Sequence, residues 1–269
     1  MAEAVMTART KGVSARRFYV WMAATCFAIA VLGFMPTYFV PMLHGQFNAP
    51  PIVHIHGVVL FSWVAFFFAQ TWLVANGRTL DHRAWGVLGV SIVTAMAFIV
   101  TAVVSMRIAQ ASLPGQPAGL AHDVRAFAWV SMGGLLFIVP VFVLAIVNIR
   151  KSEIHKRLML LMTISMLPAP IARWFLVLMA PPADPNAPLP PAGLPVILVP
   201  PVFVSIPPSL VADLLVIAAI VYDWRTRGRP HPVYVYGGIA LIAVKLLNWP
   251  ISLTPLWQSF AGGILAMAQ

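Results

Sequence analysis

The sequence predicts an all-α, polytopic membrane protein with seven transmembrane helices, its N-terminus inside and its C-terminus outside. First, 61% of its 269 residues are hydrophobic and only 9% are charged, too few to cover a water-soluble fold of this size with charge. Second, the apolar residues form seven stretches, each long enough to cross a bilayer, which takes roughly 20 residues. Third, the basic residues lie in short clusters between these stretches.

The predicted spans form one membrane domain, 18–269, which follows a polar and basic tail at 1–17. The spans cover 18–42, 52–76, 84–106, 124–148, 156–180, 195–222 and 233–260. The apolar run after the tail is too long for a signal peptide, and no A-x-A-like cleavage site follows it. We therefore interpret the tail as cytoplasmic.

Prolines mark two of the connections and one of the spans. Pro50 and Pro51 suit the start of the second helix. The connection 181–195 is rich in proline and alanine and nearly uncharged, so we expect an ordered cap on the membrane surface. Four prolines are expected to break the backbone hydrogen bonds of the sixth span, which is tolerated where neighbours or a cavity satisfy the freed carbonyls. They are Pro200, Pro201, Pro207 and Pro208.

The positions of arginine and lysine orient the chain. They collect in the tail and in alternate connections, at 77–83, 149–157 and 223–231, whereas the other connections carry almost none. The positive-inside rule then places these connections in the cytoplasm, as in a bacterial inner-membrane protein. Basic clusters arranged in this way fix the orientation of the chain in the membrane, so the net charge of +10 does not indicate a nucleic-acid partner.

Histidines gather near the ends of the predicted spans. His44, His54, His56 and His122 fall at the outer face, and His82, His155 and His231 fall at the inner face. Since the lone Cys26 allows no CxxCH attachment, a haem here would be held by axial imidazoles from facing helices. The expected ligand pairs are His56 with His122 at the outer face and His82 with His155 at the inner face.

Helical periodicity selects His56 over His54 as the inward-facing residue of the second span. Residues two apart point to nearly opposite sides of a helix, and His56 shares its side with Trp63 and Gln70. A glutamine amide facing lipid would be costly, so this side should face the bundle. Span four repeats the spacing of a histidine and a tryptophan seven residues apart, and spans three and five open alike. These similarities predict a duplicated two-helix unit, 52–106 and 122–180.

The order of helices and histidines resembles the cytochrome b561 family. In that family, single histidines on four consecutive helices bind one haem near each membrane face. The resemblance covers roughly 50–180 and implies haem b at the two histidine pairs. Because these histidines sit in outermost turns, two haems would lie about 30 Å apart, so a single centre at one face is equally consistent with the sequence. Arg173, in the outer third of span five, would meet a haem propionate or a lipid phosphate, with Asp123 as the alternative partner of Arg173 or Arg125.

Other roles for these residues stay open. His54, His56 and His122 offer imidazole ligands for copper or zinc. Histidines near an interface also simply bond to lipid headgroups or loop carbonyls. Asp213 and Lys245 lie at matching depths in the last two spans, so we expect an ion pair, either a structural clamp or part of a proton or quinone-headgroup site.

Three functional hypotheses follow, and the sequence alone does not decide whether the protein is an enzyme. The first is a b-type cytochrome-like redox protein that carries electrons between a quinol and an acceptor. The second is a non-catalytic subunit or assembly factor whose partners are other subunits of a membrane complex. The third is a transporter built on Asp213, Lys245 and the proline-interrupted sixth span. All three place the protein in a lipid bilayer.

Overall fold

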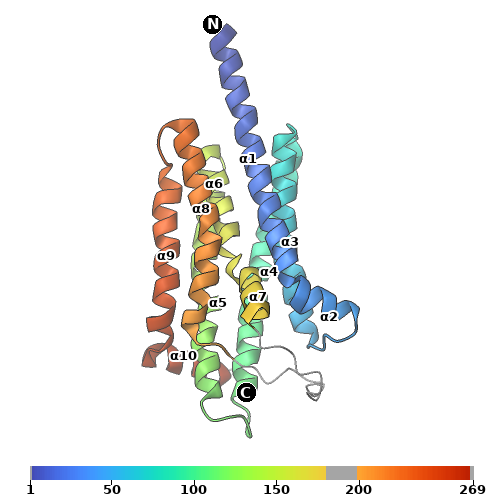
Figure 1. The fold of residues 1–269 in the computed structure, drawn as a ribbon, viewed down its shortest axis with the longest axis vertical. Helices are drawn as coiled ribbons and strands as arrows, with labels where there is room; N and C mark the ends of the chain where they lie inside the picture. The colour runs from blue at the N-terminus through green and yellow to red at the C-terminus, as the bar shows by residue number, and fades with distance from the viewer. Residues whose placement is uncertain (1, 180–198, 267–269) are drawn as a thin grey trace.

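The computed structural model describes residues 2–179 and 199–266, with side chains for 16–179 and 199–263. Every regular element in these residues is helical (Figure 1). The elements are α1 (Ala2–Phe34), the π-helical turn η1 (Met35–Phe39), α2 (Val40–Leu43), α3 (Pro51–Ala75), α4 (Thr79–Ala111), α5 (Leu120–Val147), α6 (Ser152–Ser165), α7 (Pro168–Met179), the 3₁₀ turn η2 (Val202–Ser205), α8 (Ile206–Arg227), α9 (Pro232–Ser252) and α10 (Pro255–Ala266). Within the described ranges they provide seven membrane-length apolar spans, which confirms the predicted number.

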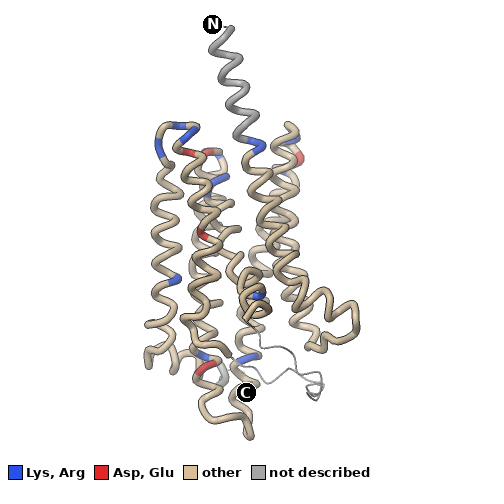
Figure 2. The backbone as a smooth tube through the Cα atoms, in the orientation of Figure 1, with Lys and Arg blue, Asp and Glu red and all other residues tan. Residues whose placement is uncertain are grey.

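The long helices lie side by side, and their connections gather at two ends (Figure 1). We call one the basic end; it holds the connections 76–78, 148–151 and 228–231, and α1 begins beyond it. Lysine and arginine are concentrated there (Figure 2). The opposite end holds the connections 44–50, 112–119 and 253–254. The basic clusters that the sequence analysis identified therefore lie together at one end of the bundle.

The helix α6 lies at the centre of the packing. It contacts α1, α5, α8 and α9. Its second half, from Leu160 to Ile164, is fully buried. Trp63 of α3 reaches the same helix, where its Nε1 donates to Thr163 Oγ1 over 3.1 Å. The predicted inward face of the second span is therefore present, because Trp63 and Gln70 are both buried.

Prolines divide the structure at places where the predicted spans were continuous. The fifth span is split into α6 and α7 ahead of Pro168, because proline lacks the N–H of a continuing helix and disfavours helical geometry in the residue before it. The predicted end of the last span, residue 260, is wrong. The helix α9 ends at Ser252, and a separate short helix, α10, begins at Pro255.

The structure of the sixth span differs from the expectation that its four prolines break the helix. Pro207 and Pro208 do not interrupt a helix; they lie in the first turn of α8, where backbone N–H groups have no partner within the helix. Pro200 and Pro201 precede the turn η2. The expected surface cap at 181–195 lies outside the described residues, as does the start of the predicted span at 195–198.

The duplicated two-helix unit stays a prediction. Its first copy corresponds to α3 and α4, and α4 is continuous from Thr79 to Ala111. The second copy corresponds to α5 followed by the divided pair α6 and α7. At the other end of the chain, α1 begins at Ala2, so the predicted tail is helical and continuous with the first span.

Gly33 lets α1 and α7 pack closely, and this contact gives a first prediction. A Cβ at Gly33 would come within 2.5 Å of both the Cβ and the carbonyl oxygen of Pro170. We expect Gly33→Ala to force the helices apart and to lower the free energy of unfolding by about 1–3 kcal/mol. Gly134→Ala is the matched control, since nothing lies within 4 Å of its added Cβ. Thermal unfolding in detergent measures both, and equal melting temperatures would contradict the prediction.

Candidate functional site

Two imidazoles from different helices meet at the basic end. His82 is the fourth residue of α4, and His155 is the fourth residue of α6. Their ring centroids lie 6.3 Å apart with the ring planes 78° from parallel. This is the inner pair that the sequence predicts.

Hydrogen bonding within the described chain leaves at least one ring nitrogen of each histidine in this pair available. His155 Nδ1 lies 2.9 Å from the carbonyl oxygen of Ala145 on α5, and because a carbonyl only accepts, the imidazole N–H must donate. A neutral His155 then carries its lone pair on Nε2. His82 Nδ1 is buried and has no hydrogen-bond partner within the described chain. Histidines that bind metal ions commonly donate their other N–H to a backbone carbonyl, as His155 does.

His82 and His155 are the two residues that would hold a haem or a metal ion at this end, because imidazole nitrogens are ligands for both. Arg83, beside His82, has no acidic partner within 4 Å among the described residues, so its charge is available to an anionic group such as a propionate.

The expected outer pair is not brought together in the same way. The exposed His122 uses Nδ1 to contact Asp123 Oδ1 at 3.2 Å. The described part of the chain shows no ring contact between His122 and His56, whose Nδ1 is buried without a partner. His54 Nδ1 lies 2.9 Å from the Tyr38 hydroxyl. Within the described ranges, no three His, Cys, Asp or Glu side chains converge as a metal site, and a copper or zinc site at His54, His56 and His122 stays a prediction.

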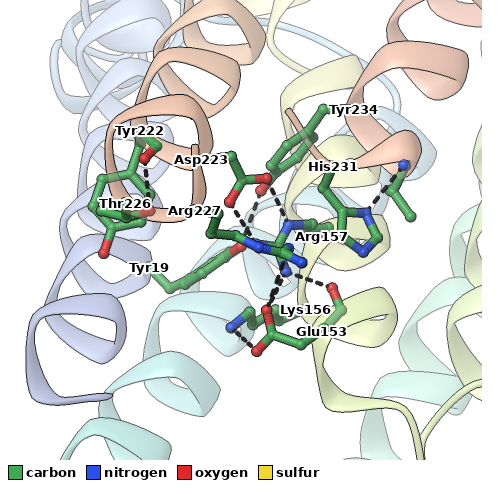
Figure 3. Close-up of polar contacts among 11 residues, drawn as sticks. Tyr19, Glu153, Lys156, Arg157, Tyr222, Asp223, Thr226, Arg227, His231 and Tyr234 are labelled. Atoms are coloured by element: carbon green, nitrogen blue, oxygen red, sulfur yellow. Dashed lines mark hydrogen bonds and ion pairs between the residues drawn. The ribbon is translucent and has the colours of Figure 1, made fainter. Parts of the chain in front are cut away.

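The other side of α6 carries a buried ion-pair cluster (Figure 3). Arg157 is two residues beyond His155, so the two side chains leave the helix on nearly opposite sides. Its guanidinium holds Asp223 of α8 in a two-bond arrangement, Nε to Oδ2 at 2.8 Å and Nη2 to Oδ1. Nη1 also donates to Glu153 Oε2 at 2.7 Å. The Arg157 and Asp223 side chains are only 2% and 1% exposed.

Aromatic side chains and a histidine complete this cluster. The hydroxyls of Tyr19 on α1 and Tyr234 on α9 lie 3.2 Å apart, and Lys156 lies over the Tyr19 ring. Burial lowers the pKa of His231, and the charge of Arg157 lowers it further. Its neutral ring accepts a hydrogen bond from the Val233 N–H over 3.2 Å at the start of α9. The cluster thus ties α1, α6, α8 and α9 together at the basic end.

The expected ion pair between the last two long helices is present. Lys245 Nζ lies 2.5 Å from Asp213 Oδ1 and 3.2 Å from the carbonyl oxygen of Ser209. Both ions are buried, and each reduces the cost of burying the other. Asp213 Oδ2 and the nearby Asn248 Oδ1 are buried and have no partner among the described residues.

The sequence predicted the inner histidine pair and the Asp213–Lys245 pair, but it gave no role to Asp223. That aspartate lies at the edge of the basic cluster 223–231, and nothing in the sequence pattern distinguishes it from that cluster.

Comparison with protein-family models, with curated proteins and with solved structures found no match to this chain. The chemistry of the site therefore has to be argued from its geometry.

Proposed function

We propose that this protein is a membrane electron carrier that holds one haem b between His82 and His155 at the basic end. The observation that carries the proposal is the pair of imidazoles on α4 and α6 whose ring centroids lie 6.3 Å apart. A haem iron with two axial histidines supplies reversible one-electron transfer. The proposal keeps the inner half of the layout that resembles the cytochrome b561 family, and it does not require the outer half.

The surrounding residues explain how the chain would support this role. The Ala145 carbonyl fixes the tautomer and orientation of His155 and makes its Nε2 a better ligand. His82 has a buried nitrogen without a partner among the described residues, which is unfavourable unless a ligand satisfies it. Arg157 and Asp223 anchor the same turn of α6 from its other side, so that turn is held in place. These contacts support a ligand pair that is ordered before haem binds.

The proposed location is a bacterial inner membrane with the basic end in the cytoplasm. The support is the concentration of lysine and arginine at the end where α1 begins (Figure 2). Cytoplasmic connections carry an excess of these residues. The haem site would then lie near the cytoplasmic face.

Haem titration of the detergent-purified protein tests the proposal. We expect a six-coordinate, low-spin absorption spectrum that saturates at about one haem per chain, as expected for one bis-histidine site. The control is the double variant His56→Ala/His122→Ala, which should bind the same amount. Absence of a low-spin spectrum would refute the haem site. Saturation at two haems, falling to one in the double variant, would instead establish an outer site as well.

The Asp213–Lys245 pair supports a second candidate, proton-coupled transport. Its specific support is the buried Asp213 Oδ2, which has no partner within the described residues and so offers a place for a proton or a polar substrate. In proteoliposomes, Asp213→Asn should abolish proton flux if this candidate holds. Flux that is absent from the unsubstituted protein would leave the pair as a structural clamp.

A further inference from the structure

Two arginines in the opposite half of the bundle lack a carboxylate partner in the described residues. Arg107 on α4 and Arg173 on α7 are half-buried, and the charge of Arg173 acts on both Arg107 and His56 of α3. The described acidic side chains are all engaged elsewhere: Asp81 with Arg78, Asp123 with His122, Glu153 and Asp223 with Arg157, and Asp213 with Lys245. Like charges held together inside a membrane protein call for an anion.

These three basic residues each lie within two helical turns of a helix end that is remote from the basic end. His56 is five residues from the start of α3, Arg107 is four from the end of α4, and Arg173 is six from the end of α7. At 1.5 Å per residue, these offsets correspond to about 6–9 Å from the helix ends.

Buried polar atoms that have no partner among the described residues lie on α3 and α4 and on η1 beside α7. They are His56 Nδ1, Gln110 Oε1 and Thr37 Oγ1. Gln110 is one helical turn beyond Arg107, and Thr37 is in η1, which packs against α7. An imidazole N–H, a hydroxyl and an amide in its flipped orientation can each donate to an anionic oxygen. The unpaired groups are therefore of the kind that a phosphate would satisfy.

We infer that Arg107, Arg173 and His56 form a binding site for the headgroup phosphate of an anionic phospholipid. Guanidinium groups bind phosphate with two parallel hydrogen bonds, and basic pockets between transmembrane helices bind anionic headgroups. The Arg173 guanidinium also lies 5.3 Å from the centroid of the Phe34 ring, so the site has an apolar wall suited to a lipid. This site is separate from the imidazole pair at the basic end and does not depend on haem.

Lipid competition measured by native mass spectrometry tests the inference. The detergent-purified protein is offered equal amounts of phosphatidylglycerol and phosphatidylcholine, and the bound lipids are counted. We expect about tenfold more phosphatidylglycerol to be retained, and we expect Arg173→Gln to remove most of that preference. Arg125→Gln is the matched control, because Arg125 lies at the same end but bonds to Gln258, and it should keep the preference.

Further variants keep the test decisive. If Arg173→Gln does not fold, Arg173→Lys provides a second test. It keeps the charge but lacks the planar guanidinium group, so it should lose part of the preference for phosphatidylglycerol. Equal retention of the two lipids, or an unchanged preference in both Arg173 variants, would overturn the inference. Displacement of phosphatidylglycerol by millimolar inorganic phosphate would show a site for a soluble anion instead. A rise in retention in Asp184→Asn, at a position outside the described residues, would show that the chain's own carboxylate occupies the arginines.

Discussion

Asp223→Asn is expected to lower the free energy of unfolding by about 3 kcal/mol, since it leaves the buried Arg157 guanidinium without its principal counter-charge. Removing one partner of a buried ion pair generally costs about 3–5 kcal/mol. The lower value applies here because Glu153 still bonds to Arg157 from a half-exposed position. Unfolding of the detergent-purified protein in increasing dodecyl sulfate, followed by tryptophan fluorescence, measures the change.

Two controls identify the cause of that loss. Asp81→Asn breaks the exposed pair with Arg78 and should cost less than about 1 kcal/mol. The double variant Arg157→Met/Asp223→Leu removes both charges and should recover much of the lost stability, because buried pairs can be replaced by apolar side chains. Equal effects of Asp223→Asn and Asp81→Asn would show that the cluster does not hold the helices together.

His82→Ala and His155→Ala are each expected to reduce bound haem by at least about tenfold, because each removes one of the two proposed ligands. The remaining haem should lose its six-coordinate, low-spin spectrum. Haem extracted per mole of purified protein measures the loss, and absorption spectroscopy measures the change in coordination. His155→Met should restore part of the binding, because a thioether also ligates haem iron.

The control for the histidine variants is His44→Ala, which changes an exposed ring at the opposite end of the bundle. It should leave the haem content unchanged. If the His82 and His155 variants kept the same haem content and spectrum as His44→Ala, other residues would have to be the ligands.

The number of spans could be predicted from the sequence, but their breaks could not be read from composition alone. The fifth span stays apolar across Met166 and Leu167, so its hydropathy gives no sign that the helix ends before Pro168. The same is true at Pro255, where α10 begins. Local backbone chemistry, not hydrophobicity, decides these boundaries.

Part of the candidate site could be predicted because helix order and depth constrain which side chains meet. The spacing placed His82 with His155, and equal depth placed Asp213 with Lys245. The contacts of His122 with Asp123 depend on local rotamers that no pattern specifies. The role of Asp223 depends on a partner 66 residues away, on a helix whose rotation the sequence does not give.

The absorption spectrum of the protein purified from haem-supplied cells, before and after reduction with dithionite, tests the central claim most directly. The account predicts a Soret band and an α-band that sharpen on reduction, and predicts that both are lost in His82→Ala and His155→Ala. A colourless protein, or a haem spectrum unchanged in both variants, would contradict it.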